Sequence, residues 1–323
     1  MRVLVIGGSG HIGSFLVPRL VRAGHQVVSL SRGTATPYTA GDEWSQVERV
    51  LADREQEDRE GVFADRVVRL RADVVVDLLC FTLESATALV DRLRGETAHL
   101  VGCGSVWRAG PSTTLPISEE NAPPAVGEYG IQKDRIARLL AEETASGGLV
   151  TTSLHPGHIS GPGWAPIGPT GNLDPTVWST LAAGEPLLVP GLGTETMHHV
   201  HADDVAQAFE LAIAHRDAAA GQDFFVTAAE GLNVRGYAEV AAGWFGRTAQ
   251  LEHVSWERFR DDLAPRHAEA SWEHLSRSQV FSVDKARRLL GFEPRFSVAD
   301  TVRESVRRLI DDGTVSVPRP MVL

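Results

Sequence analysis

The sequence contains few cysteines and no long apolar run. Cys80 and Cys103 are the only cysteines among 323 residues, and both close short apolar stretches typical of buried strands. This excludes the disulfide framework of small secreted proteins, and we expect both thiols to be reduced. Only four consecutive apolar residues precede Gly7, too few for a signal-peptide core, and no later stretch approaches a membrane span. These absences predict a cytoplasmic protein.

The sequence also lacks an excess of positive charge. Its formal net charge of -11 repels phosphate backbones and anionic lipid surfaces, so we expect neither nucleic acid nor a membrane as a partner. With 43% apolar and 23% charged residues, the composition is that of an ordered globular protein. The length predicts one large domain or two domains that share a core. We find no internal repeat and no low-complexity segment.

The first half of the chain alternates short β-branched runs with amphipathic segments of helical length. Such alternation is typical of an α/β fold, in which helices cover both faces of a parallel sheet. The predicted strands span residues 3–6, 26–30, 47–51, 73–79, 98–103 and 149–154, and the predicted helices span 12–23, 57–70, 83–94 and 129–146.

The texture of the sequence changes after His155. The stretch HPGHISGPGWAPIGPTGNLDP is dense in glycine and proline, which predicts irregular loops of the kind that build a substrate pocket. Residues 197–201 are predicted to form a strand that returns to the sheet. Asp203 and Asp204 are predicted to cap the helix that follows, because carboxylates accept hydrogen bonds from free N–H groups at a helix start.

Three glycines follow the first predicted strand in V3-L-V-I-G7-G-S-G10-H-I-G13. Gly7 permits a tight turn, Gly10 lets the backbone approach a pyrophosphate, and Gly13 lets the helix pack near the strand. A plain strand-to-helix turn is the alternative, but the strand-loop-helix context favours dinucleotide binding. The expected cofactor contacts are Gly7, Ser9, Gly10, His11, Ile12 and Gly13.

The second predicted strand ends without the carboxylate that NAD enzymes of this architecture place there. Ser31 and Arg32 instead offer a hydroxyl and a guanidinium, which suit a 2'-phosphate. The sequence therefore favours NADP, with NAD as the alternative if Arg32 is only a solvated surface residue. Asp53 follows the third strand, where it can accept a hydrogen bond from the adenine amine or cap a helix. The remaining candidate contacts at strand ends are Leu79, Cys80, His155 and His158.

Tyr129 and Lys133 stand four residues apart, so both leave the same face of the predicted helix. A phenol with a pKa of about 10 is a poor base at neutral pH. A nearby ammonium and an oxidised nicotinamide would favour the phenolate and lower the pKa of Tyr129, and Lys133 would also hold the nicotinamide ribose. A surface pair is the alternative, because this spacing also occurs by chance.

Five segments together resemble the extended short-chain dehydrogenase/reductase family, and above all its NAD-dependent epimerase/dehydratase branch. They are the glycine loop, the Tyr129/Lys133 pair, H155-P-G-H-I-S-G-P-G163, H201-A-D-D-V-A206 and D284-K-A-R-R-L-L-G-F-E-P-R295. The resemblance implies a Rossmann fold, a doubly wound parallel sheet of about seven strands, with a smaller C-terminal substrate-binding domain. It also implies a catalytic tyrosine, lysine and hydroxyl residue, and a homodimer formed through the helix of Tyr129 and its neighbour.

This resemblance assigns parts of the chain to domains. Residues 1–154, joined again by 197–228, are expected to form the dinucleotide-binding domain. Residues 155–196 and 229–323 are expected to form the substrate-binding domain.

The sequence departs from the family pattern at the hydroxyl position, which Cys103 occupies. Ser105, two residues later, would lie on the same strand face and could polarise a substrate oxygen. A buried cysteine is a weak donor, so Ser105 is the better candidate, with Cys103 as the alternative.

The family's sugar-nucleotide epimerases carry two phosphate-binding arginines that are missing here. Met197 fills one position and S271-W-E-H274 covers the other, with only Arg277 nearby. A diphosphate would lack its bidentate partners, which disfavours a UDP- or TDP-sugar substrate. His158 stands where those epimerases often carry asparagine. Several tryptophans in the second half, which line an apolar pocket or fill the core, are Trp164, Trp178, Trp256 and Trp272.

The cluster H198-H199-V-H201 does not predict a metal site, because on a strand His198 opposes the other two and spacing fixes no third ligand. The sequence predicts an NADP(H)-dependent oxidoreductase that acts on a ketone or secondary alcohol of a small non-nucleotide metabolite. An epimerase or dehydratase that works by transient hydride transfer would use the same apparatus. Cys103 leaves open a catalytically inactive dinucleotide-binding sensor or RNA-associated protein.

Overall fold

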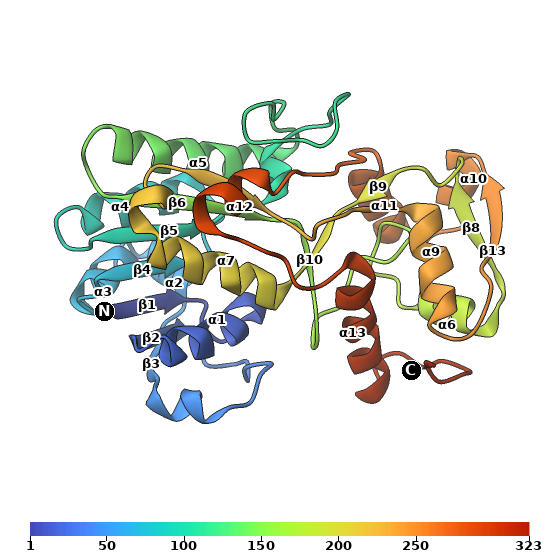
Figure 1. Ribbon diagram of the computed structural model, residues 1–323, viewed down its shortest axis with the longest axis horizontal. Helices are drawn as coiled ribbons and strands as arrows, with labels where there is room; N and C mark the ends of the chain where they lie inside the picture. The colour runs from blue at the N-terminus through green and yellow to red at the C-terminus, as the bar shows by residue number, and fades with distance from the viewer. Residues whose placement is uncertain (323) are drawn as a thin grey trace.

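A sheet of seven parallel strands lies at the centre of the larger lobe in this computed structural model, which describes residues 1–322 (Figure 1). The strand order is β11-β6-β5-β4-β1-β2-β3, and it reverses direction between β1 and β4. The predicted doubly wound Rossmann sheet is therefore confirmed. Ligands of such sheets bind outside the carboxyl ends of the strands at this reversal. The strands are β1 (Arg2–Ile6), β2 (Gln26–Ser31), β3 (Glu48–Leu51), β4 (Val74–Asp77), β5 (His99–Cys103), β6 (Thr151–Pro156) and β11 (Asp223–Val226).

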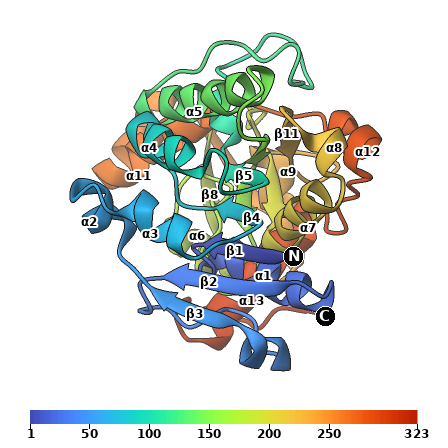
Figure 2. The ribbon, with the colours of Figure 1, turned by 90° about the vertical axis from the view of Figure 1, so that its left-hand side faces the viewer.

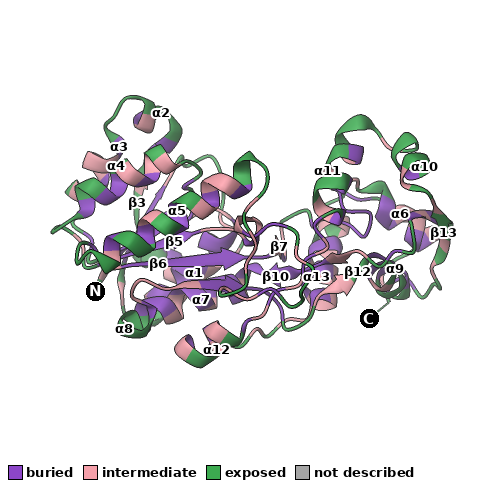
Figure 3. Cartoon of the chain, turned by 90° about the horizontal axis from the view of Figure 1, so that it is seen from above, coloured by how far each residue is buried: buried purple, intermediate pink, exposed green. Residues whose placement is uncertain are grey.

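Two hydrophobic layers sandwich the sheet, because successive strand residues point to opposite faces. In β1, Val3 and Val5 pack toward α1 and α7, whereas Leu4 and Ile6 pack toward α3, α4 and α5 (Figure 2). Buried residues accordingly follow the strands and the inner faces of the helices (Figure 3). The helices are α1 (His11–Arg22), α2 (Arg54–Arg59), α3 (Phe63–Arg69), α4 (Leu83–Leu93), α5 (Glu128–Ala145), α7 (Ala202–Ala214) and α8 (Arg216–Ala219), with two 3₁₀ turns, η1 (Asp42–Gln46) and η2 (Val106–Arg108).

A smaller lobe lies beyond the carboxyl ends of the strands (Figures 1 and 3). Its own core is built around Trp178, Tyr237 and Phe245, and its strands β8 and β13 pair in parallel. Its elements are α6 (Thr176–Ala183), β8 (Pro186–Pro190), α9 (Val234–Gly243), β13 (Gln250–Val254), α10 (Trp256–Asp261), α11 (Pro265–Leu275) and α13 (Val298–Asp311).

The chain passes several times between the lobes. Two short strand pairs lie at this junction: β7 (His158–Ser160) with β10 (His199–His201), and β9 (Thr196–Met197) with β12 (Leu232–Asn233). Near the C-terminus, α12 (Asp284–Leu290) packs against α7, α8 and β11 on the larger lobe. None of the helices within residues 1–322 combines the length and apolar character needed to cross a membrane.

Most predicted strands and helices of the first half end within two residues of the observed ends, but one helix predicted there and one strand predicted later in the chain were wrong. The helix predicted over 57–70 is two helices, α2 and α3, separated at Gly61, whose φ of 70° is left-handed. The strand predicted over 197–201 is divided between β9 and β10, which belong to different small sheets. The strand that returns to the large sheet is β11 instead.

The predicted cap of α7 was also wrong. The helix begins at Ala202, ahead of both carboxylates, so His201 occupies the capping position and its Nδ1 accepts from the Asp203 amide at 2.9 Å. Asp204 instead accepts hydrogen bonds from the backbone amides of Arg295 (3.0 Å) and Phe296 (3.1 Å). Asp204 therefore ties the C-terminal segment to the start of α7.

Candidate active site

The glycine loop connects β1 to α1 at the reversal point of the sheet. Gly7 has a φ of 89°, and its amide donates to the Leu30 carbonyl at 2.8 Å, which ties the loop to β2. A Cβ on Gly13 would lie 2.4 Å from the Gly7 carbonyl oxygen, so only glycine lets α1 start this close to the loop. Gly10 caps α1 without any side-chain hydrogen bond. The first amides of α1 are therefore left for an anion.

The predicted neighbours in this loop take different positions. Ser9 is half-buried, whereas His11 and Ile12 are buried inside α1. The His11 ring stacks on Trp164 with 5.1 Å between centroids, and burial lowers the pKa of His11 to about 3. His11 is therefore a neutral packing residue beneath the loop from the smaller lobe that carries Trp164.

Ser31 and Arg32 lie where β2 ends. The Ser31 hydroxyl accepts from the Gly33 amide at 3.4 Å. The Arg32 side chain is exposed and makes no hydrogen bond or ion pair with any residue between 1 and 322. A free guanidinium therefore stands at the strand end where a dinucleotide places its adenosine ribose.

Asp53 follows β3 and caps α2, since its Oδ1 accepts from the Gln56 amide at 3.1 Å. The capping alternative is thus what the side chain does in this structure. Leu79 and Cys80 follow β4, and Leu79 lies over the glycine loop, 2.9 Å from where a Cβ on Gly7 would stand. The Cys80 side chain is buried, and its carbonyl accepts a hydrogen bond from Lys133.

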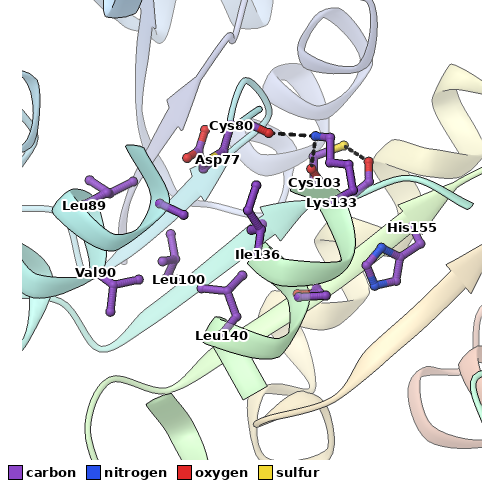
Figure 4. Close-up of a pocket in the computed structure, with 15 residues that line it drawn as sticks. Asp77, Cys80, Leu89, Val90, Leu100, Cys103, Lys133, Ile136, Leu140 and His155 are labelled. Atoms are coloured by element: carbon purple, nitrogen blue, oxygen red, sulfur yellow. Dashed lines mark hydrogen bonds between the residues drawn. The ribbon is translucent and has the colours of Figure 1, made fainter. Parts of the chain in front are cut away.

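Lys133 is buried at the carboxyl ends of β4 and β5. Its Nζ donates to the carbonyl oxygens of Cys80 at 2.7 Å and Cys103 at 2.9 Å (Figure 4). The same Nζ lies 5.7 Å from the centre of the Tyr129 ring and 4.7 Å from that of Phe81. Lys133 therefore joins two neighbouring strand ends and places a cation beside the tyrosine.

Tyr129 lies in the first turn of α5 and remains 42% exposed. Its phenol lies close to the Ser105 hydroxyl, and its ring packs edge-on against Trp107 with 5.9 Å between centroids. Burial of the phenol raises the pKa of Tyr129, and the nearby Ser105 hydroxyl lowers it in part. The groups of the protein itself therefore do not produce the lowered pKa that we expected, because burial outweighs them.

The structure separates the two candidates for the third catalytic group. β5 ends at Cys103, so Ser105 is not on the strand as predicted but caps η2, accepting from the Trp107 amide at 3.2 Å. This turn brings the Ser105 hydroxyl to the Tyr129 phenol. The Cys103 thiol is buried and donates to the Gly104 carbonyl at 3.8 Å (Figure 4). Burial raises the pKa of this thiol to about 11.

The two predicted pocket histidines line different cavities. His155 is fully buried in β6 and lines the same cavity as Lys133 and Cys103 (Figure 4). A Cβ on Gly104 would lie 1.9 Å from its Nδ1, so the ring fills the space beside Gly104. His158 in β7 lines a second cavity, next to His274 with 5.0 Å between ring centroids.

The comparisons with known proteins agree with this geometry. Residues 3–227 match the model of the NAD dependent epimerase/dehydratase family. The chain belongs to this family.

Its relatives include reductases and epimerases. The 2'-dehydrokanamycin reductase of Streptomyces kanamyceticus is 30% identical over 67% of this chain, but the match spans only 58% of that enzyme. The UDP-glucose 4-epimerase of Mycolicibacterium smegmatis is 28% identical over 95% of this chain and 97% of its own length. Such relatives support an enzyme of the oxidoreductase or epimerase type.

A solved structure shows the same fold. The UDP-glucuronic acid 4-epimerase of Bacillus cereus, in complex with UDP-glucuronic acid and NAD, superposes with a TM-score of 0.73 at 16% identity, over 96% of this chain and 99% of that protein.

The histidine cluster of this family member forms three separate contacts. His198 Nε2 bonds to the Ala228 carbonyl at 2.9 Å, His199 Nε2 to the Ile167 carbonyl at 3.1 Å, and His201 Nε2 to Glu304 at 3.2 Å. Within residues 1–322, no group of three histidine, cysteine, aspartate or glutamate side chains could hold a metal ion.

Sequence reasoning did not assign four side chains to the site, although it named His274 and Arg277 in another context. Phe81 and Trp107 follow β4 and β5, so their place at the carboxyl ends of parallel strands was a usable signal. His274 and Arg277 come from the distant segment at the end of α11, and Arg277 stacks on Trp107 at 4.2 Å. No local sequence pattern predicts the contact between Arg277 and Trp107, because it depends on how the two lobes pack together.

Proposed function

We propose that the protein is an NADP(H)-dependent oxidoreductase that reduces a ketone, or oxidises a secondary alcohol, on a small non-nucleotide metabolite. The observation that carries the proposal is the Tyr129 phenol, which lies close to the Ser105 hydroxyl and beside the buried Lys133 cation. This group lies at the carboxyl ends of β4 and β5, next to the glycine loop.

The residues of the loop fit a dinucleotide. The uncapped start of α1 supplies free amides, and Gly13 keeps the backbone close to β1. A nicotinamide dinucleotide supplies the hydride when it is bound. Gly7, Gly10 and the first turn of α1 would hold its pyrophosphate.

In reduction, Tyr129 gives its phenolic proton to the carbonyl oxygen of the substrate, and Ser105 donates a hydrogen bond to the same oxygen. Burial keeps the phenol protonated at neutral pH, which is the form that a general acid requires. In oxidation the phenolate takes the proton from the alcohol, and the Lys133 cation stabilises that anion.

The preference for NADP rests on Ser31 and the free Arg32 guanidinium. Replacing Arg32 with alanine should raise the KM for NADPH by roughly 10- to 100-fold, because hydrogen bonds between charged groups contribute about 1.5–3 kcal/mol. The KM for NADH should not change. Arg69→Ala removes an exposed arginine from α3 and serves as the control. Equal loss for both cofactors would assign NAD to the site.

An epimerase is the second candidate, favoured by the near full-length match to the Mycolicibacterium enzyme. Against a sugar nucleotide stands Met197, which is 1% exposed in β9 and pairs with Leu232. The position therefore offers no group to a diphosphate.

Turnover of a ketone panel with NADPH tests the proposal. A net loss of 340 nm absorbance is expected, whereas an epimerase would turn over without net change. Tyr129→Phe should lower kcat by roughly 10²- to 10⁴-fold, the contribution of general acid catalysis, while the affinity for NADPH stays the same. Unchanged turnover in this variant would refute the catalytic assignment.

The homodimer and the cytoplasmic location also remain predictions. Sedimentation equilibrium of the purified chain tests the first, and fractionation of the source cells tests the second.

A further inference from the structure

Arg277 is a buried arginine without an acidic partner. It follows α11, is 8% exposed, and lies flat on Trp107 with its guanidinium carbon 4.2 Å from the ring centre. Its single hydrogen bond runs from Nη2 to the Val126 carbonyl at 3.2 Å. Nε and Nη1 are buried without any acceptor, so one N–H on Nε and two on Nη1 are unused.

The buried Arg54 shows what this chain does with a structural arginine. Arg54 is equally buried, but it bonds to Asp77, Asp58 and Ser85. No carboxylate lies within 4.0 Å of Arg277 anywhere in residues 1–322, and the nearby Glu273 is exposed. Burial lowers the pKa of Arg277, which expresses the cost of holding this cation away from water. An anion from outside the chain would satisfy it.

Arg277 lines a small cavity between residues of the two lobes. The space of about 10 Å³ is roughly that of one water molecule, so one terminal oxygen of a ligand fits inside it and the rest of the ligand lies outside. The ring nitrogens of His158 are buried there without partners and provide further hydrogen bonds. The cavity is lined by Val106, Trp107, His158, Thr196, His198, His274, Arg277, Gln279 and Phe281.

Arg277 supplies the only charge in this lining at neutral pH. Burial lowers the pKa of His158, His198 and His274, so the three rings are neutral. One fixed positive charge matches a monoanion and is too little for a diphosphate.

The cavity adjoins the reacting groups. Trp107 contacts Arg277 on one side and Tyr129 on the other. Val126, which accepts the Arg277 bond, precedes Tyr129 by three residues. Arg277 and Tyr129 therefore contact the same tryptophan ring, which places the cavity beside the candidate catalytic tyrosine.

We propose that Arg277, unpaired in a cavity beside Trp107 and Tyr129, binds a carboxylate of the substrate, so that the enzyme acts on oxo or hydroxy acids. This inference rests on the proposed reductase function. His158 donates to the same carboxylate, and the planar guanidinium fixes its orientation.

A matched pair of substrates tests the proposal. Benzoylformate and methyl benzoylformate share the same ketone, but only the first carries a carboxylate. The wild-type enzyme with NADPH should show a KM for the acid at least about 10-fold below that for the ester. Arg277→Gln should raise the KM for the acid by roughly 10- to 100-fold and leave kcat and the ester unchanged.

Two further variants control for structure. Arg277→Lys keeps the charge without the planar fork and should recover part of the preference for the acid. Arg303→Gln alters a half-buried arginine of α13 outside the cavity and should alter neither KM. An equal KM for acid and ester in the wild type, or an Arg277→Gln variant that keeps the preference, overturns the proposal.

Binding of benzoate separates this proposal from the reductase function. Calorimetry with the NADP⁺ complex of Tyr129→Phe should show saturable benzoate binding that Arg277→Gln abolishes. Absence of benzoate binding by wild type at about 10 mM, a concentration that detects even very weak affinity, overturns the carboxylate site. Binding without turnover of any ketone supports the carboxylate site and overturns the reductase instead.

Discussion

The ion pair between Arg54 and Asp77 holds the turn that follows β4, and breaking it should be costly. Arg54 Nη1 bonds to Asp77, and its Nη2 donates to the Ser85 hydroxyl at 2.9 Å. Asp77 Oδ1 also accepts from the Leu79 amide at 3.1 Å. The carbonyl of Cys80, the residue after Leu79, accepts a hydrogen bond from Lys133. The ion pair therefore supports the turn that positions the candidate catalytic lysine.

The burial of both groups sets the magnitude. Side-chain exposures of 8% for Arg54 and 4% for Asp77 place the pair away from water, and removing one member of such a pair costs about 3–5 kcal/mol. Asp77→Leu should lower the free energy of unfolding by about 3 kcal/mol, because Asp58 still lies 3.3 Å from Arg54 Nε. Arg54→Met should lower the free energy of unfolding by about 5 kcal/mol, because the Asp77 carboxylate then keeps only the hydrogen bond from the Leu79 amide.

The double variant Arg54→Met/Asp77→Leu gives the sharper result. It leaves neither member of the pair as an uncompensated charge, so its stability should fall within about 1 kcal/mol of wild type. The measurement is urea unfolding at 25 °C, followed by circular dichroism. Arg235→Met serves as the control, because Arg235 and Glu239 form a solvent-exposed pair on α9, and the stability of this variant should be that of wild type. A double variant as unstable as the sum of its single changes would refute the reasoning.

Three further predictions address the site. Gly13→Ala should abolish measurable NADPH binding in a fluorescence titration, because its Cβ would meet two backbone oxygens at 2.4 and 2.5 Å; Gly243→Ala, in open space on α9, should have no effect. Ser105→Ala removes the hydroxyl that lowers the pKa of Tyr129, so the rise of alcohol oxidation with pH should move to higher pH than in wild type, while ketone reduction stays flat around neutrality; identical pH profiles would contradict this. Cys103→Ala should keep most of the turnover, whereas Ser105→Ala should lose roughly 100-fold; the reverse order of kcat values would return the catalytic role to Cys103.

Local sequence signals predicted the strands and the glycine loop well. Val3 to Ile6 form a strand because their β-branched and aliphatic side chains fill both layers of the sandwich at once. The role of Gly13 could be predicted from the sequence because the carbonyls that it approaches, those of Gly7 and Gly8, lie only a few residues before it. Features of this kind depend on neighbours a few residues away.

The errors arose where a single residue or a distant contact decides the structure. Gly61 divides a segment whose apolar spacing is otherwise that of one helix. Ser105 leaves the strand because β5 ends at Cys103, where the chain turns into η2. Arg277 meets Trp107 across 170 positions of the chain, and no periodicity encodes that approach.

The absence of a diphosphate anchor bears on the choice between reduction and epimerisation. An epimerase that works by transient oxidation must keep its oxidised intermediate bound until the hydride returns, so it needs strong contacts remote from the reacting carbon. Met197 is buried in β9 and supplies none, and Arg277 offers one charge in a cavity that admits a single small group. A ligand held by one carboxylate leaves sooner than one held by two phosphates and two arginines. The proposed reductase function agrees with this geometry, because a weakly held product is released after a single hydride transfer, which is net reduction or oxidation.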